Sequence, residues 1–245
     1  LPSGKIFFTG PNYFTYLLNL ETGHWEQPIW SLSTFRGGTA VQYLPGKILK
    51  TGDNGLTSVP TSAVIDLSNG ESGPGWREVS QSSLMLPRVE HNMTILPTGE
   101  VLVTGGLRLR TNIATAVRQP QIWNPNTETW TDSLLLAPDP VHRDYHSTAL
   151  LLPDGRILSG GGDLKSSPAD TSRLTATIYW PPYLFDSEGN LAPRPTITGG
   201  PEEIGYGQTF LLHVPDPEKI RSVVLMRPGC VTHAFNQEQR YVPLQ

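Results

Sequence analysis

Short apolar runs separated by turn signals recur along the whole chain, and few stretches keep a helical period. In the clearest case, the apolar run Ala149–Leu152 is followed by Asp154 and Gly155 and then by a second short run over residues 156–159. An Asp-Gly pair between two such runs predicts a β-hairpin with a type I′ turn, because that turn needs positive φ at both central residues.

The same hairpin pattern occurs four times. The copies read LPSGK-IFFTG, LPGK-ILKTG, LPTGE-VLVTGG and LPDGR-ILSGGG, with turn glycines at Gly4, Gly46, Gly99 and Gly155. A second motif follows the hairpin in residues 17–25 and 121–130, where a strand and a polar turn end on tryptophan. Each unit therefore offers four strands in roughly 50 residues, which is typical of a kelch-type blade of a β-propeller. The chain opens directly on such a repeat, so we expect a fragment of a larger ring.

The rhythm changes near residue 190. Beyond it, Phe210–Val214 and Ser222–Met226 have the composition of strands in a small sandwich-like domain. We therefore expect an all-β protein with two parts. Residues 1–193 would form about four propeller blades, and residues 194–245 would begin a second domain.

The composition of the chain restricts the classes of partner that it can bind. The 245 residues include 24 glycines and 23 prolines, carry a net charge of −4 and show no basic cluster, which argues against nucleic acid. No apolar run approaches the roughly 18 residues that a membrane span needs. Cys230 is the single cysteine of the sequence, so an internal disulfide is excluded.

Histidines supply the candidate chemistry. Tyr145 and His146 stand side by side before the last hairpin, and a phenol next to an imidazole suits a metal site, although such a pair alone is more often a plain surface feature. His91 stands at nearly the same place before its own hairpin, where it could face the axis near His146, although we expect its replacement to have little effect on a metal site. Arg108 and Arg110 follow a Gly-Gly pair in a loop, where they could contact an oxygen-rich substrate or simply be solvated.

Three late segments carry a family resemblance. They are RDYHSTALLLPDGRILSGGG at residues 143–162, PPYLFDSEGNLAPRP at residues 181–195 and RPGCVTHAFNQEQRYVPL at residues 227–244. In this order they resemble the copper radical oxidases, the family of galactose oxidase and glyoxal oxidase. The resemblance implies a seven-bladed kelch propeller followed by an immunoglobulin-like domain, which is truncated in this chain.

The resemblance also implies roles for three residues. His146 and His233 would be equatorial ligands of a copper ion, and Tyr145 would be its axial ligand and the general base. Two imidazoles with oxygen donors suit tetragonal Cu(II). The family adds a radical on a tyrosine cross-linked to a cysteine, and nothing in this sequence matches that pair. Cys230 lies in a different segment, three residues before His233.

Two function classes follow. The resemblance implies the C-terminal part of a secreted, monomeric oxidase that converts aldehydes, primary alcohols or sugars with O2 into products and hydrogen peroxide. Without the Tyr-Cys radical cofactor, the 245 residues alone are expected to be inactive. The alternative is a non-catalytic kelch propeller that binds carbohydrate or protein on its face. A cysteine and a tyrosine upstream, on two earlier blades, would favour the oxidase.

Overall fold

The structure is a computed structural model, and it describes most of the chain. The described residues are 1, 3–10, 14–26, 29–30, 38–52, 60–71, 75–79, 85–132, 135–162 and 174–245. Their helices are single 3-10 turns, namely η2 (Ile113–Thr115), η6 (Pro182–Leu184) and η7 (Pro217–Lys219). Within the described part, no helix has the length and apolar character needed to span a membrane. The predicted all-β class is confirmed.

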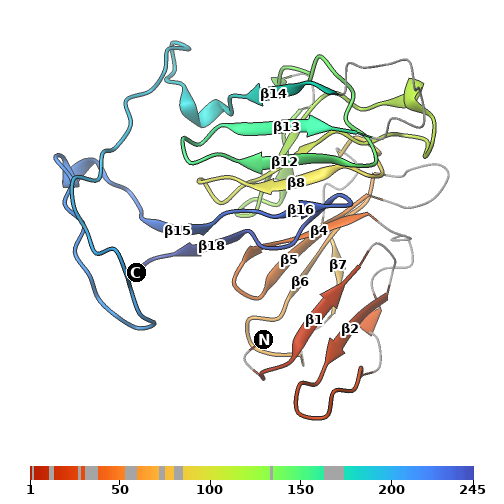
Figure 1. Ribbon diagram of the computed structural model, residues 1–245, viewed down its shortest axis with the longest axis horizontal. Helices are drawn as coiled ribbons and strands as arrows, with labels where there is room; N and C mark the ends of the chain where they lie inside the picture. The colour runs from red at the N-terminus through yellow and green to blue at the C-terminus, as the bar shows by residue number, and fades with distance from the viewer. Residues whose placement is uncertain are drawn as a thin grey trace.

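Four antiparallel sheets follow one another along the chain and fan out side by side (Figure 1). The first contains β1 (Ile6–Thr9), β2 (Phe14–Leu18) and β3 (Ile29–Trp30), and the second β4 (Thr39–Leu44), β5 (Lys47–Thr51), β6 (Ser62–Asp66) and β7 (Arg77–Glu78). The third contains β8 (Asn92–Ile95), β9 (Val101–Thr104), β10 (Gln121–Asn124) and β11 (Thr129–Trp130), and the fourth β12 (Ser147–Leu151), β13 (Ile157–Gly161) and β14 (Ala176–Tyr179). The two middle sheets thus have the four strands expected of a blade.

The predicted glycine turns are present, but the predicted turn type is wrong. In the β12–β13 hairpin Gly155 has φ 81°, whereas Asp154 is not among the residues with positive φ. The Gly155 N–H donates to the Leu152 carbonyl at 2.9 Å. This pattern fits a type I turn followed by a left-handed glycine, because Pro153 pre-sets the φ that the first central position of a type I turn needs. The turn at Gly99 repeats the same bond to the residue three positions earlier, at 2.9 Å.

Apolar side chains join each sheet to the next. Trp76 belongs to a buried cluster between the first and second sheets. Between the second and third, the rings of Tyr43 and Trp123 meet edge to face with centroids 4.9 Å apart. Leu102 and Ile157 lie in the cluster between the third and fourth sheets. Because every interface is apolar on both sides, each sheet is stabilised mainly by its neighbours.

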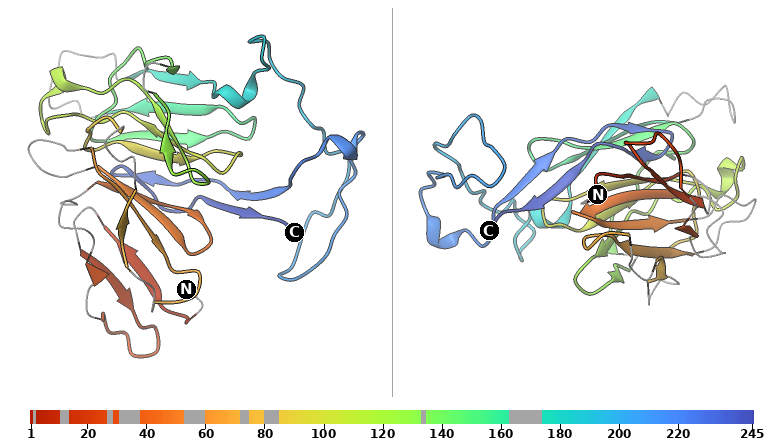
Figure 2. Two further views of the ribbon diagram at one scale, coloured as in Figure 1. Left: turned by 180° about the vertical axis from the view of Figure 1, so that it is seen from behind. Right: turned by 90° about the horizontal axis from the view of Figure 1, so that it is seen from below.

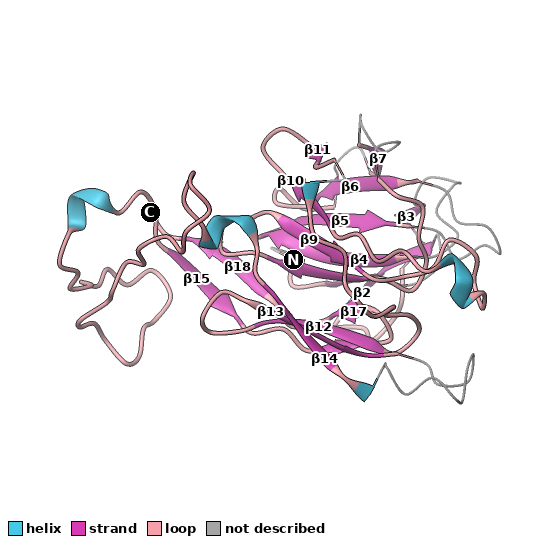
Figure 3. Ribbon diagram, turned by 90° about the horizontal axis from the view of Figure 1, so that it is seen from above, coloured by secondary structure: helices cyan, strands magenta, loops and turns pink. Residues whose placement is uncertain are grey.

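The last part of the chain returns to the sheets as a two-stranded finger. It is made of β15 (Val224–Arg227) paired with β18 (Arg240–Pro243), and β16 (Val231–Thr232) paired with β17 (Phe235–Asn236). β17 contacts β4 and β8, and β16 contacts β12, so the finger runs between the sheets (Figures 1 and 3). The chain leading into the finger loops away from them (Figure 2).

Of the two strands predicted in this last part of the chain, one is present. A strand begins at Val224, inside the predicted Ser222–Met226. The strand predicted over Phe210–Val214 is wrong, since the one β contact of this segment is an isolated bridge between His213 and Gly199. Alternation of apolar residues does not produce a strand where no neighbouring strand offers a hydrogen-bonding edge.

Buried Lys50 makes the stability of the fold depend on pH. It lies on β5 with no exposed surface, its Nζ is 5.9 Å from the ring centroid of Trp76, and burial lowers its pKa from 10.5 to about 8. Between pH 8 and 10.5 the unfolded chain holds this proton more tightly than the folded one, so stability rises with pH across that window. Lys50→Met is expected to stabilise the fold at pH 7, by at most roughly 3 kcal/mol, and to flatten the rise.

Denaturant unfolding at pH 7 and pH 10 measures this effect. The matched control is Lys219→Met, since Lys219 has a side chain that is 71% exposed. If the free energy of unfolding rises equally between pH 7 and pH 10 in the wild type and in Lys50→Met, the pH dependence does not come from Lys50.

Candidate metal centre

The three residues predicted to form one site lie together in the structure. The ring centroids of Tyr145 and His146 are 3.8 Å apart, and the ring of His233 lies 5.1 Å from His146 and 5.8 Å from Tyr145. Tyr145 is half-buried, whereas both imidazoles are exposed. Two distant segments thus present one phenol and two imidazoles to the same small volume.

A tight turn before β12 presents the first two side chains. The backbone N–H groups of His146 and Ser147 both donate to the Asp144 carbonyl, at 2.7 and 3.0 Å. His146 has φ 145°, a conformation that residues with a side chain rarely adopt. Such backbone persists only where the surroundings impose it.

Arg143 supplies part of that support from behind the turn. Its buried guanidinium donates to the Gly161 carbonyl and to Thr177 Oγ1, both at 3.2 Å. Its Nε lies 3.6 Å from a carboxylate oxygen of Asp139, and its carbonyl accepts from the Gly106 N–H at 2.7 Å. The residue before the Asp144–Ser147 turn is therefore fixed by both main-chain and side-chain bonds.

His233 lies at the tip of the finger, in a strained turn. His233 and Ala234 are the two residues between β16 and β17, and they have φ 52° and 65°. Positive φ at both central residues is the mark of a type I′ turn, which usually requires asparagine and glycine. The Thr39 hydroxyl donates to the Ala234 carbonyl and ties the tip to the start of β4.

The side chain of His233 has a partner of its own. Its Nδ1 lies 2.7 Å from Thr232 Oγ1. A histidine ligand commonly donates one ring N–H to a neighbour and offers the other nitrogen to the metal. When Nδ1 of His233 donates to Thr232, Nε2 of His233 is free to accept a bond.

His91 belongs to the packing between two sheets. It has no exposed surface, and its Nε2 lies 2.7 Å from Thr51 Oγ1. Burial, with a smaller contribution from the charge of Arg88, lowers the pKa of His91 well below its usual range. A neutral, buried imidazole bonded across the second and third sheets fits a structural role.

The loop arginines differ from a purely solvated pair. Arg110 Nε lies 3.0 Å from a carboxylate oxygen of Glu90, and Glu90 has φ 60°. Arg108 also has an interaction partner. Arg110 thus ties its loop to the residue just before His91.

The donor set suits a soft-to-borderline transition metal. Among the described residues, no three His, Cys, Asp or Glu side chains group closely enough to hold a metal ion, and the phenol of Tyr145 is the further oxygen that lies beside His146 and His233. Two imidazoles and a phenol oxygen are the ligands that Cu(II) accepts in a tetragonal site. Cys230 is exposed and not disulfide-bonded. The sequence singled out the three residues that lie together here, but it gave no signal for the bonds that Arg143 and Thr232 make beside them.

Comparisons with known proteins indicate the same family as the sequence resemblance. Residues 57–179 match the family described as Glyoxal oxidase N-terminus, and residues 194–245 match Galactose oxidase-like, Early set domain. The chain is 36% identical over 216 residues to a galactose oxidase of Gibberella zeae, covering 84% of this chain and 31% of that protein. It is 32% identical over 168 residues to the aldehyde oxidase GLOX of Vitis pseudoreticulata, covering 64% of this chain and 32% of that protein. The chain spans about a third of the length of both relatives.

A solved structure shares the architecture. A fungal alcohol oxidase of the AA5 family, solved in complex with copper, superposes with a TM-score of 0.84 at 25% sequence identity. The match covers 99% of this chain and 52% of that one. This likeness confirms an all-β fold of the galactose oxidase-like kind.

Removal of the Arg143 guanidinium is expected to destabilise the protein. Arg143→Met leaves Asp139 without its buried partner and two acceptors without donors, which costs roughly 3 kcal/mol. Denaturant unfolding measures the loss, with Arg110→Met as control, since that exposed ion pair contributes about 1 kcal/mol or less. A loss in Arg143→Met no larger than in the control would show that the turn does not depend on this guanidinium.

Proposed function

Because the chain belongs to the copper radical oxidase family of galactose oxidase and glyoxal oxidase, we propose that it is part of an oxidase acting on aldehydes, primary alcohols or sugars. O2 is the electron acceptor and hydrogen peroxide the second product. The observation that carries the proposal is the convergence of Tyr145, His146 and His233 from two distant segments.

The three side chains have distinct tasks. His146 and His233 would hold a copper ion through ring nitrogens, and Tyr145 would add its phenol oxygen. A copper ion held there would supply a one-electron acceptor and would lower the pKa of a ligating phenol. Tyr145 would then serve as the general base that takes the proton of a substrate hydroxyl, because its phenol lies beside both imidazoles.

The candidate centre is open to solvent. Both imidazoles are exposed, so an alcohol or a hydrated aldehyde can reach them. The strained turns at His146 and His233 hold the donors in place before any ligand arrives. A preformed donor set lowers the entropy cost of binding the metal, which is the benefit that such strain provides.

Further parts of the proposal concern the whole protein. We place the propeller blades in residues 1–193 and the immunoglobulin-like domain in residues 194–245, and we propose a secreted, monomeric enzyme. Two-electron oxidation needs a second one-electron acceptor beside copper, for which the family uses a cross-linked Tyr-Cys pair. The one cysteine of these 245 residues, Cys230, lies on the exposed finger and matches no member of that pair.

Loss of either imidazole is expected to abolish tight copper binding. In the intact protein, His146→Ala and His233→Ala each remove one of two nitrogen donors, and the affinity for Cu(II) should fall by more than about 100-fold. A competition titration measures the affinity, and the electron paramagnetic resonance spectrum reports the nitrogens bound. His24→Ala, in an exposed turn, is the control. Unchanged affinity in both site variants would refute the site and favour a non-catalytic propeller.

The 245 residues alone are expected to give no sustained turnover when loaded with copper. Neither imidazole stores the second oxidising equivalent, and Tyr145 as general base must remain a closed-shell phenolate. A peroxide-coupled assay with glyoxal, methylglyoxal and galactose tests this, beside the intact protein. Sustained peroxide release by the 245-residue chain, lost in Tyr145→Phe, would show that turnover at this site does not need the Tyr-Cys pair.

A further inference from the structure

Two buried carboxamides fasten the finger to the third sheet. The Gln239 Oε1 accepts from the Ile95 N–H at 2.8 Å, and the Gln239 Nε2 donates to the Ile95 carbonyl at 2.8 Å. Ile95 is the last residue of β8, and β8 ends its sheet. A primary amide offers the same donor and acceptor as a peptide group. Gln239 therefore acts toward β8 as one residue of a neighbouring strand would.

Asn236 completes the arrangement. Its Nδ2 donates to the Met93 carbonyl at 3.2 Å and to Gln239 Oε1 at 2.6 Å, and its Oδ1 accepts from the Gln239 N–H at 3.4 Å. Asn236 is 7% exposed and Gln239 1%. We call Asn236 and Gln239, with the bonds they make to Met93 and Ile95, the carboxamide clamp.

The clamp allows only one position of the finger along β8. If the finger slid by one residue, both polar groups of Ile95 and both side-chain amides would lose their partners. Each buried polar group left unpaired costs about 1–3 kcal/mol. A displaced finger is therefore excluded by several such penalties at once, whereas apolar contacts alone would tolerate a shift more easily.

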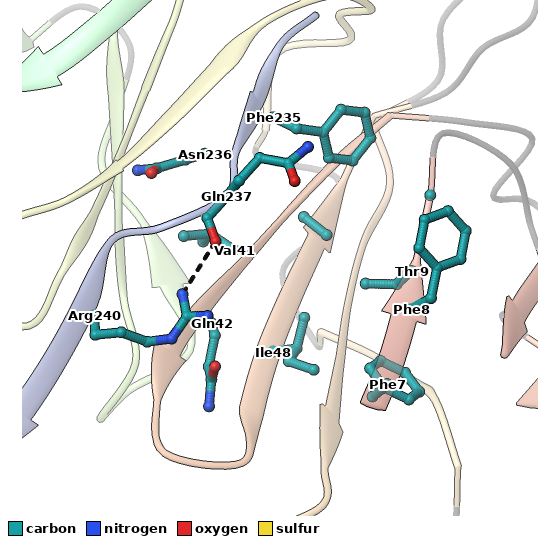
Figure 4. Close-up of a pocket in the computed structure, with 12 residues that line it drawn as sticks. Phe7, Phe8, Thr9, Val41, Gln42, Ile48, Phe235, Asn236, Gln237 and Arg240 are labelled. Carbon is teal, nitrogen blue, oxygen red and sulfur yellow. Dashed lines mark hydrogen bonds between the residues drawn. The ribbon is translucent and has the colours of Figure 1, made fainter. Parts of the chain in front are cut away.

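The opposite side of the finger is only partly filled. A pocket of about 270 Å³ lies between the finger and the first sheet, lined among others by Phe7, Val41 and Gln237. In Figure 4, Asn236 and Gln237 extend to opposite sides of the chain, and Gln237 borders the pocket. The bonds on the β8 side therefore set the position of the finger together with the contacts that β17 and β18 make with β4.

The clamp also holds a strained tip. His233 and Ala234 have positive φ, which costs roughly 1–2 kcal/mol per residue without glycine. Asn236 follows directly after Phe235 at the end of this turn, so the first bond of the clamp lies three residues from His233. Strain of this kind is retained only when neighbouring bonds over-determine the conformation.

We propose that Asn236 and Gln239 are positioning residues of the copper centre. The clamp sets how far the finger enters between the sheets, and this depth fixes the distance between His233 and His146. The inference rests on the proposed function, because it assigns the clamp a role in placing one nitrogen donor opposite the other.

The test compares two glutamines of the same finger. Gln239→Met in the intact protein keeps the length of the side chain and removes both bonds to Ile95. Gln237→Met makes the same replacement on the exposed, pocket-facing side. Thermal unfolding first identifies a temperature at which both variants are folded. Cu(II) affinity is then measured there by competition titration, together with the electron paramagnetic resonance spectrum.

Gln239→Met is expected to lower the Cu(II) affinity roughly tenfold, as loss of an outer support of a metal ligand commonly does, and to change the copper spectrum. Gln237→Met should change neither. If Gln239→Met does not fold, Asn236→Leu replaces it, because this near-isosteric change removes the bond to the Met93 carbonyl without adding a charge. It should weaken copper binding in the same direction, with a smaller effect.

The outcomes separate the two proposals. A wild-type protein whose copper binding does not depend on His146 and His233 would overturn the proposed function, and with it the role of the clamp. If the folded clamp variant binds copper with an affinity within about twofold of the wild type, and its spectrum is unchanged, the positioning role of the clamp is overturned while the proposed function stands.

Discussion

The free edge of β8 is the constraint on which the arrangement of this protein depends. β8 ends its sheet, so the polar groups of Met93 and Ile95 need partners from elsewhere once they are buried. The partners come from Asn236 and Gln239, 143 and 144 positions away in the chain. Satisfying these groups therefore brings the finger between the sheets, and with it the side chain of His233.

The candidate site contains three of the six described non-glycine residues with positive φ. His146, His233 and Ala234 all have positive φ without being glycine. Each strained residue is held by a neighbour that the sheets supply, as Arg143 does behind the first turn and Thr39 at the finger tip. Stable sheets thus compensate for unfavourable backbone at the place where three donors must meet.

The sequence predicted the local features well and the long-range ones only through the resemblance. The repeated hairpins and the Tyr145–His146 pair each depend on a short stretch of sequence, so they could be recognised from single segments. The type I′ turn was predicted at Gly155, where Pro153 favours type I, and it occurs instead at His233 and Ala234, whose residue types give no such signal. The buried state of Asn236 and Gln239 could not be foreseen, because polar residues near a turn have the composition of a solvated loop.

A centre shared between the sheets and the finger couples metal binding to docking. Hairpins such as β12–β13 form from neighbouring residues, whereas the bonds of the clamp close a loop of more than 140 residues and so form late. A protein with an undocked finger keeps Tyr145 and His146 but loses the nitrogen of His233. In the proposed enzyme, a ligand that binds all three donors favours the docked state by the difference between its binding free energies for the docked and the undocked protein. Copper would then stabilise the docked fold as well as act on the substrate. The more firmly the clamp docks the finger without metal, the smaller the share of the copper binding free energy that docking would consume.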